Sequence, residues 1–396
     1  MWPLANRAAV PGPVVDATGA EPRAIVVIGN PENRRVQMFC DAARRLAMST
    51  PRVIAYGDVL DNGLDVKLAV MPLSLVRIES PGENEPVERA LVALGASQTP
   101  DAELPRDYTP GQAVEHGRIY CPRLWYRGFC RLLETWQEEL DGLPVAWMNH
   151  PDDIRLAFDK AACQAFLDRH GIPVPRRLDT VAGYDDLRAQ MHKTGHSRVF
   201  LKLAHGSSAS GVVALQASRD RICAITSVEV VHRGDEVRLY NSLGLRRYES
   251  EPEVAALVNS LCVHGLHLEA WMPKAGLGGR TFDLRVMVIA GEVCHLVMRT
   301  SGGPITNLHL GNQRGDLAEL FRKIPADRLQ EALDTCRRVA ALFPRSLYLG
   351  IDLVFTPSFR RHAVLELNAF GDLLPGVLHL GQDTYTAELA AATRRK

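Results

Sequence analysis

Two short segments near the C-terminus decide the fold: Gly350-Ile-Asp-Leu-Val-Phe355 and Ala363-Val-Leu-Glu-Leu-Asn368. Each segment alternates in the way that is typical of a β-strand with one apolar face. A turn centred on Phe359 places Asp352 directly across from Glu366. The pattern therefore predicts a hairpin that carries two facing carboxylates beside a buried face.

These carboxylates make one face of the hairpin chemically unusual. Asn368 shares that face with Glu366, because side chains two apart on a strand point the same way. Like charges across a strand pair repel each other unless a cation joins them. Oxygen ligands suit Mg²⁺, which is bound by one or two carboxylates and by the phosphates of a nucleotide. On this fragment alone, an exposed face with accidental acids is an equal alternative.

The composition is that of a soluble globular protein. The chain has 396 residues, of which 46% are hydrophobic and 23% charged, so we expect about two to three domains. Lysine plus arginine equals aspartate plus glutamate, at 46 each, which gives no sign of binding to nucleic acid or an anionic membrane. The sequence has no apolar run of about 18 residues, so we expect no membrane span.

The cysteines and the N-terminus indicate a cytoplasmic protein. The eight cysteines are scattered, and none form a Cys-x-x-Cys pair, so we interpret them as reduced residues. Residues 1–22 contain several prolines and no continuous apolar segment, which predicts a flexible tail rather than a signal peptide.

The first part of the chain, up to about residue 147, predicts an α/β domain with a parallel sheet. Its strands and helices are expected at residues 23–29, 34–46, 52–56, 73–78, 85–94 and 123–140. The turn after the first strand lacks Gly-x-Gly-x-x-Gly, so the dinucleotide-binding fingerprint is absent.

The remainder predicts a hairpin-rich α+β body. One helix is expected between the capping residues 149–153 and Gly171. The expected strand pairs are 198–204 with 211–216, 283–290 with 293–300, and 348–355 with 363–368. The expected helices between them are 183–193, 251–263 and 326–342.

Lys202 and the segment that follows it are candidates for phosphate binding. A lysine inside an apolar strand must find an anion or lose its proton. The segment His205-Gly-Ser-Ser-Ala-Ser-Gly211 is small and flexible, so its N–H groups and hydroxyls can close over phosphate oxygens. An ordinary hairpin turn is the other interpretation of this segment.

A second strand pair brings arginines together. The turn near residue 291 places Arg299 opposite Asp283 and diagonal to Arg285. One interpretation is a cross-strand salt bridge with a spare arginine. The other is an arginine clamp on a transferring phosphate, for which planar geometry and permanent charge are suited.

The order of these motifs resembles the ATP-grasp superfamily. The resemblance is strongest to the branch of glutathione synthetase, D-alanine:D-alanine ligase and the ribosomal-protein glutamate ligase, and it covers residues 149–380. The matching motifs are Asp159-Lys160, Phe200-Leu-Lys202 with the Gly/Ser segment, Glu269-x-Trp-Met272, Asp283-x-Arg285, Arg299, Asn307, Gly-x-Asp352 and Glu366-x-Asn368. Walker A and protein-kinase signatures are absent.

The resemblance implies an α/β plus α+β fold. A Rossmann-like pre-ATP-grasp domain over residues 23–147 would precede a two-subdomain ATP-grasp fold. The first subdomain would span 148–265 and carry the Gly/Ser segment as a flap. The second would span 266–396 and carry the magnesium site.

The resemblance also implies roles for single residues toward ATP and Mg²⁺. Arg285, Arg299 and Lys202 would be catalytic, and Asp352, Glu366 and Asn368 would hold Mg²⁺. The nucleotide would be bound by Lys160, Lys202, His205, Gly206, Ser207, Ser208, Ser210, Gly211, Glu269, Ala270, Trp271, Met272, Asp283 and Asn307. Leu203 stands where relatives often carry proline, and the flap has fewer glycines than many.

The implied activity is a carboxylate–amine ligase. ATP would phosphorylate a carboxylate to an acyl phosphate, and an amine would then attack it to give an amide. Small molecules, amino acids or peptides are the expected substrates, and a homodimer is possible. A small-molecule kinase of the same fold and a non-catalytic nucleotide-binding module are the alternatives.

Further residues are weaker candidates. Arg123 and Arg127 could hold a substrate carboxylate, and His309 and Gln313 are expected beside the cleft. The spacing of His192 and His196 is zinc-like, but we interpret it as part of an exposed loop. The helical spacing of four aromatic residues predicts a buried helix face, made by Trp125, Tyr126, Phe129 and Trp136.

Overall fold

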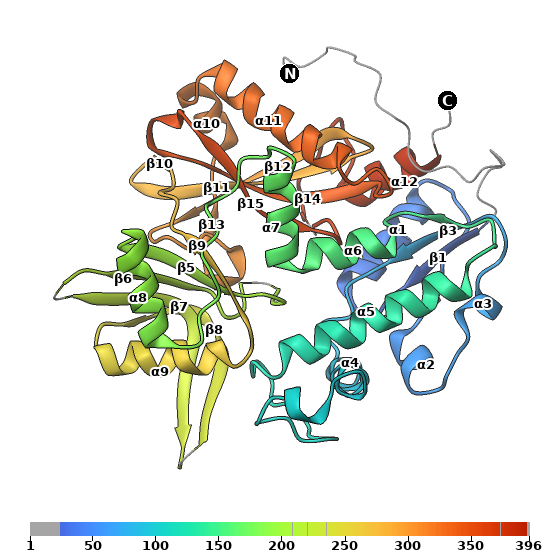
Figure 1. Ribbon diagram of the computed structural model, residues 1–396. Coiled ribbons are helices and arrows are strands. Elements are labelled where there is room, and N and C mark those ends of the chain that lie inside the picture. The colour runs from blue at the N-terminus through green and yellow to red at the C-terminus, as the bar shows by residue number, and fades with distance from the viewer. Residues whose placement is uncertain (1–23, 208, 220, 235, 373, 394–396) are drawn as a thin grey trace.

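The computed structural model describes residues 24–207, 209–219, 221–234, 236–372 and 374–393. Three sheets of four, five and six strands organise these residues. Figure 1 shows the N-terminal sheet in blue on the right, the five-stranded sheet at the lower left and the C-terminal sheet above it. The expected tail at residues 1–22 lies outside the described residues. Within them, no helix combines the length and the apolar character needed to cross a bilayer.

The N-terminal sheet is parallel and has the order β2-β1-β3-β4. The predicted β-α-β unit and the third strand are confirmed. The helices α2 and α3 were not predicted, because they are too short to show a helical period in the sequence. The strands are β1 (Ala24–Ile28), β2 (Arg52–Ile54), β3 (Ser74–Ile78) and β4 (Ala146–Trp147). The helices are α1 (Arg34–Arg45), α2 (Tyr56–Leu60), α3 (Val66–Ala69), α4 (Glu85–Ser97), the 3₁₀ helix η1 (Asp101–Glu103) and α5 (Pro122–Glu139).

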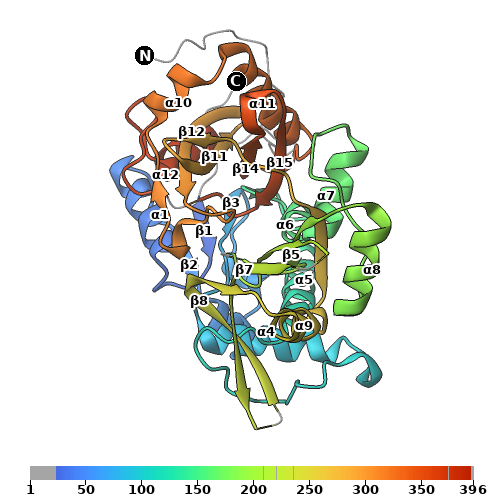
Figure 2. The same cartoon turned by 90° about the vertical axis from the view of Figure 1, so that its left-hand side faces the viewer.

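The five-stranded sheet is antiparallel, with the order β8-β7-β6-β5-β9. Its elements are α8 (Tyr184–Thr194), β5 (Arg198–Leu203), β6 (Val213–Ala217), β7 (Ile222–Arg233), β8 (Glu236–Tyr248), α9 (Glu251–Cys262) and β9 (Leu266–Ala270). The long hairpin of β7 and β8 was not predicted, and it projects from the body in Figures 1 and 2. Because β9 pairs with β5, the chain leaves this sheet after Ala270, not at the predicted boundary of residue 265.

The C-terminal sheet has the order β13-β12-β11-β14-β15, and β10 pairs with β11. Its strands are β10 (Gly276–Leu277), β11 (Arg280–Ile289), β12 (Glu292–Ser301), β13 (Gln313–Arg314), β14 (Tyr348–Phe355) and β15 (His362–Asn368). The other elements are η2 (Leu308–Leu310), α10 (Leu317–Lys323), α11 (Ala326–Ala341), η3 (Pro357–Phe359) and α12 (Thr384–Thr393). All three predicted strand pairs are therefore confirmed.

The single helix predicted before Gly171 is wrong, because the structure has two: α6 (Pro151–Phe158) and α7 (Lys160–Arg169). Asp159 between them has an extended backbone, with ψ at 100°, which ends α6. Its side chain accepts a 2.9 Å hydrogen bond from the Ala162 N–H, and so it caps α7. This break makes Lys160 the first residue of α7.

One hydrophobic core joins the two ends of the chain. It includes Val26 and Ile78 from the N-terminal sheet, Phe129 from α5, and Phe282 and Ile351 from the C-terminal sheet. A separate core lies between the five-stranded sheet and the helices α8 and α9. The N-terminal and C-terminal sheets therefore pack as one body.

A buried arginine strengthens the junction between these sheets. Arg77 in β3 is fully buried, and its guanidinium contacts Glu79 at 2.7 Å and Glu388 of α12 at 2.6 Å. The rings of Tyr348 and Tyr385 lie 4.6 and 5.1 Å from the same guanidinium. The helix α12 also packs on α1, so the end of the chain returns to the first domain.

Helices α4 and α5 cross unusually closely at two glycines. A Cβ on Gly95 would lie 1.8 Å from the carbonyl oxygen of Leu124, and one on Gly128 would lie 2.0 Å from that of Leu91. Both obstacles are backbone atoms, so no side-chain rotation can make room.

Gly95→Ala should lower the free energy of unfolding by about 1–3 kcal/mol, because the helices must separate to admit the methyl group. Gly244→Ala is the control, because no atom lies within 4 Å of its added Cβ. Urea unfolding followed by circular dichroism measures both variants. Equal stability of Gly95→Ala and the natural protein would contradict the close packing of these helices.

Candidate functional site

The hairpin of β14 and β15 carries the predicted magnesium ligands. Asp352 lies directly opposite Glu366, as the turn position predicts, and the register shifts only after this pair. Asp352 is buried, whereas the side chain of Glu366 is 30% exposed. Asn368 lies opposite Gly350 and donates a 3.4 Å hydrogen bond to its carbonyl oxygen. The two carboxylates thus face each other across adjacent strands.

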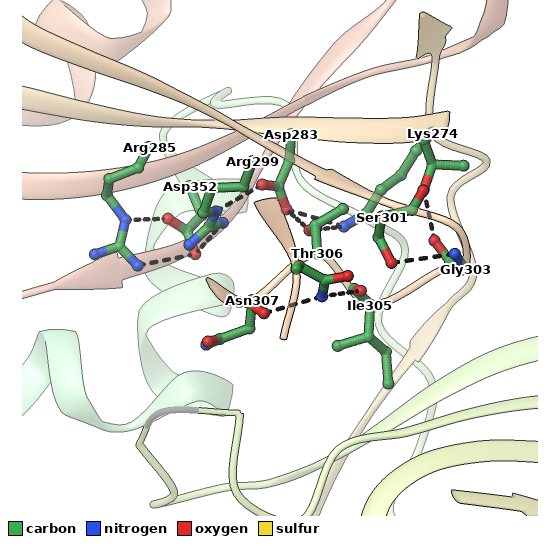
Figure 3. A network of polar contacts seen from close by, with 12 residues as sticks. Lys274, Asp283, Arg285, Arg299, Ser301, Gly303, Ile305, Thr306, Asn307 and Asp352 are labelled. Carbon is green, nitrogen blue, oxygen red and sulfur yellow. Dashed lines mark hydrogen bonds and ion pairs between the residues drawn. The ribbon is translucent and has the colours of Figure 1, made fainter. Parts of the chain in front are cut away.

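Two arginines hold Asp352, one from the adjacent strand β11 and one from β12 beyond it (Figure 3). Asp283 lies opposite Arg299, which confirms the predicted register, and Arg285 lies opposite Asp352. Arg285 Nε is 2.5 Å from Asp352 Oδ1, and Arg299 Nη2 is 3.0 Å from Asp352 Oδ2. Arg299 Nε also lies 2.7 Å from Asp283 Oδ1. Both arginines therefore converge on one buried carboxylate.

Three further side chains complete this network, and the sequence motifs do not include them. Lys274 Nζ lies 2.9 Å from Asp283 Oδ2 and donates to the Thr306 hydroxyl at 2.6 Å. Asp372 Oδ2 lies 2.9 Å from Arg285 Nη1. The network thus balances three cations against three acids: Lys274, Arg285 and Arg299, with Asp283, Asp352 and Asp372.

The buried acids of the network are held in their charged form. Burial works to raise the pKa of Asp352, but the charges of Arg285 and Arg299 outweigh it and lower that pKa. The pKa of Asp283 is lowered against its burial by Arg299 and Lys274 in the same way. Both carboxylates are therefore anionic at neutral pH, as metal ligation or cation pairing requires.

Lys202 meets its anion on the adjacent strand. Its Nζ lies 2.5 Å from Glu269 Oε1, and both side chains are buried. Gln164 donates to Glu269 Oε2 at 3.2 Å, and His267 Nε2 lies 3.5 Å from the same oxygen. Although burial opposes it, the charge of Lys202 is the main cause that lowers the pKa of Glu269 to about 2. The ion pair with Glu269 therefore holds the Lys202 side chain in place.

Lys160 joins the flap to the magnesium hairpin. Its Nζ lies 2.7 Å from Glu366 Oε1 and donates to the Gly206 carbonyl oxygen at 2.6 Å. The Lys160 N–H also donates to the Ala204 carbonyl oxygen at 3.1 Å. The cap at Asp159 places this lysine, because it starts α7 directly beside the flap.

The flap itself is anchored at its first residue. His205 Nε2 lies 3.3 Å from Asp159 Oδ2, and the imidazole stacks on Tyr126 with a centroid distance of 4.0 Å. Gly211 ends the flap with φ at 65°, and a Cβ there would lie 2.4 Å from Leu203 Cγ. Ser208 lies outside the described residues. The end at Gly211 requires a glycine on both grounds.

A cleft between the five-stranded and C-terminal sheets brings together eight of the predicted site residues. Phe200 and Met272 form its apolar side, and Lys274 and Thr306 line it from the network. The predicted residues along it are Lys202, Glu269, Met272, Asp283, Arg299, Asn307, Asp352 and Glu366. Arg285 joins them through Asp352, and Lys160 joins them through Glu366.

Some predicted residues lie beside the cleft. Ala270 is the last residue of β9, and Trp271 follows it. The ring of Trp271 packs on that of Phe200, with 5.1 Å between their centroids. Four flap residues line a second groove on the other side of the flap: His205, Gly206, Ser207 and Ser210.

The four candidate residues for substrate binding do not lie together in the structure. His309 lines the second groove, whereas Gln313 lies in β13 and pairs with Thr300. Arg123 is exposed, and Arg127 donates to the hydroxyl of Thr99, just after α4, at 2.7 Å. Neither arginine lines the cleft or the groove.

The donor set at the hairpin fits Mg²⁺. Among the described residues, no three or more His, Cys, Asp and Glu side chains cluster as they would in a site made by the protein alone. Two carboxylates and an amide oxygen are a set that Mg²⁺ uses together with substrate phosphates. Cationic side chains already contact Asp352 and Glu366, so the hairpin attracts positive charge.

Lys274, Thr306 and Asp372 were missed because they lie in loops and not in strands. Lys274 and Asp372 lie outside regular elements, and their partners are distant in sequence. Thr306 directly precedes the predicted Asn307, and this position is the sequence signal that could have identified it. Arg35 of the first domain was also missed; it donates to the Phe370 carbonyl oxygen at 3.1 Å and approaches Asp372 at 3.9 Å.

No family model and no curated protein matches this chain. Solved structures do match. D-cycloserine synthetase DcsG has 14% identity and a TM-score of 0.54, covering 93% of this chain and 99% of its own. The ATP-grasp ligase PsnB, solved with a minimal precursor, has 17% identity and a TM-score of 0.51, covering 93% and 97%.

The macrocyclase MdnC from Microcystis aeruginosa, bound with the precursor peptide MdnA, is also similar. It has 11% identity and a TM-score of 0.50, covering 92% of this chain and 97% of its own. These similarities extend over nearly the whole of each chain. The chain therefore has the ATP-grasp fold.

Proposed function

We propose that the protein is an Mg²⁺- and ATP-dependent carboxylate–amine ligase. One observation carries the proposal: Asp352 and Glu366 face each other, with Arg285, Arg299 and Lys160 in direct contact with them. Phosphoryl transfer depends on positioning and charge neutralisation more than on a covalent protein group. A cleft that holds two acids among three cations can both position a phosphoryl group and neutralise its charge.

The nucleotide would lie in the cleft between the two sheets. Lys160 and Lys202 would bind its phosphates, and residues 205–211, with Ser208 among them, would cover them. Residues 269–272 would meet the adenine, with Asp283 and Asn307 nearer the ribose and phosphates. Asp352, Glu366 and Asn368 would hold Mg²⁺, which neutralises phosphate charge when bound.

The reaction has two steps. A carboxylate oxygen of the substrate attacks the γ-phosphorus of ATP, the bond to ADP breaks, and an acyl phosphate forms. The nitrogen of an amine then attacks the carbonyl carbon, the bond to phosphate breaks, and the nitrogen loses a proton. Arg285 and Arg299 stabilise the charge on the transferring group, and the flap excludes water from the acyl phosphate.

The substrate class is inferred from the similar structures, and the cellular compartment from the cysteines. PsnB was solved with a minimal precursor and MdnC with a precursor peptide, which supports amino acids or peptides as substrates here. The eight cysteines are scattered and form no Cys-x-x-Cys pair, which supports a reducing cytoplasmic setting. A homodimer stays a prediction.

A trapping assay tests the reaction itself. The protein is incubated with Mg²⁺, ATP, hydroxylamine and pooled amino acids and short peptides, and ADP and hydroxamate are followed together. Hydroxamate formed with ADP is the expected result, because hydroxylamine captures an acyl phosphate. ADP with a phosphorylated small molecule and no hydroxamate would instead establish the kinase alternative.

Glu366→Gln should lower turnover roughly 100-fold or more, because it removes one charge from the proposed metal ligands. The Mg²⁺ concentration for half-maximal rate should rise at the same time. Glu292→Gln is the matched control, since Glu292 lies at the far turn of the same sheet and pairs with Arg337. Full activity of Glu366→Gln, with an unchanged Mg²⁺ requirement, would remove Glu366 from the site.

Arg285→Lys should lower kcat about 10²- to 10³-fold and leave ATP affinity nearly unchanged. The lysine keeps a positive charge beside Asp352 and Asp372, but it cannot present two N–H groups in a plane. Arg280→Lys is the control, because Arg280 begins the same strand and donates to the Thr300 carbonyl oxygen. A loss of ATP affinity without a loss of kcat would show that Arg285 binds the nucleotide and does not serve the transfer.

A further inference from the structure

A second groove lies on the opposite side of the flap from the nucleotide cleft. It has a volume of about 430 Å³, within the range of small-molecule sites. Its walls come from the loop after β3, the start of α4, residues 114–125, the flap, and β8. Leu310 lines the groove and belongs to the same apolar cluster as Ala209 and Ile305, which line the nucleotide cleft. The two spaces are therefore neighbours across one layer of side chains.

One end of the groove is formed by the carboxyl edge of the parallel sheet, where open α/β sheets bind ligands. The loop after β3 is held there by the loop after β1. Asn30 donates to the Pro81 carbonyl oxygen at 3.0 Å, and Asn84 donates to Glu32 Oε1 at 2.6 Å. Because both contacts join different loops, they fix the position of the side chains between them.

This end of the groove is acidic. Glu83 and Glu88 line it, and Glu88 Oε1 accepts a 3.0 Å hydrogen bond from the Glu83 N–H. In the described part of the chain, neither carboxylate has a lysine or arginine within ion-pair distance. Glu85, on the outer side of the same turn, is paired with Arg89 at 3.1 Å. Burial is the main cause that raises the pKa of Glu88, and the neighbouring carboxylates of Glu85 and Glu83 raise it further, against the hydrogen bond from the Glu83 N–H.

The cation on the opposite wall is already neutralised. Arg118 pairs with Glu236 at 3.4 Å and lies over the Tyr120 ring at 5.0 Å, and its side chain is 4% exposed. Between the two ends, the wall is apolar, with Trp125 stacked on Phe158 at 5.3 Å. Among the described residues, the charged groups of the groove that no lysine or arginine compensates are therefore Glu83 and Glu88, and Glu83 Oε2 accepts only a 3.4 Å hydrogen bond from the Asn33 side chain.

We propose that this groove binds the acid substrate, and that the substrate carries a cationic amino group held by Glu83 and Glu88. This inference rests on the proposed ligase function, because it takes the flap as the place of reaction. The apolar part of the substrate packs against Trp125 and Phe158, and its carboxylate lies at the flap, toward the nucleotide. The substrate class is an amino acid or short peptide with a free amino group.

Binding to paired probes tests the assignment without turnover. L- and D-amino acids and dipeptides, each with its N-acetyl counterpart, are titrated calorimetrically into the full-length protein without ATP. The free amine that binds should bind at least about tenfold tighter than its N-acetyl counterpart, as expected for a charge-assisted hydrogen bond. Equal binding of the two forms, or no binding of any free amine, would overturn the proposal.

Glu88→Gln identifies the group responsible. Glutamine can still accept the hydrogen bond from the Glu83 N–H, so the loop is kept while the charge is removed. The preference for the free amine should fall to less than about threefold, and Glu83→Gln should reduce it as well. Glu85→Gln is the matched control and should keep the full preference. An unchanged preference in Glu88→Gln and Glu83→Gln would exclude these acids.

The two proposals fail in different ways. If the free amines bind selectively but neither ADP nor hydroxamate forms, the ligase reaction is wrong and the amine site remains. If hydroxamate forms equally from acids with and without an amino group, the ligase reaction holds and the amine site is wrong.

Discussion

Charge pairing inside a buried cleft is the constraint on which the rest of the structure depends. Strands that form a hydrophobic core can carry carboxylates only if cations compensate the lost hydration. Here Asp352 meets Arg285 and Arg299, Glu366 meets Lys160, and Glu269 meets Lys202. Binding of a metal–nucleotide complex would exchange partners, because the metal brings positive charge to the acids and the phosphates bring negative charge to the lysines. The cleft would thus remain close to neutral before and after binding.

The strand register converts this constraint into geometry. Asp283 lies opposite Arg299, Arg285 opposite Asp352, and Asp352 opposite Glu366, so four strands contribute to one row of charges. Slipping any pair by one residue would turn its charged side chains to the other face. The apolar face of the same strands, including Leu284, Ile351 and Leu353, is fully buried and opposes such a slip.

The sequence predicts this row well, since a short turn fixes the register of an antiparallel pair and apolar alternation fixes its faces. It predicts less where neither rule applies. Lys274 and Asp372 lie in irregular segments, so no period relates them to Asp283 or Arg285. The break at Asp159 is hidden because apolar residues continue on both sides of it. The β7–β8 hairpin is partly exposed and charged, so its alternation is weak.

The separation of the hydrophobic cores has a consequence for the order of events. The N-terminal and C-terminal sheets share one core, reinforced by Arg77, whereas the five-stranded sheet has its own core with α8 and α9. Lys202 and Glu269 belong to the second body, and Asp352, Glu366 and both arginines belong to the first. Under the proposed function, neither body alone contains a complete reaction centre. Activation of the substrate would then require their correct approach, so an unstable acyl phosphate would form only where water has already been displaced.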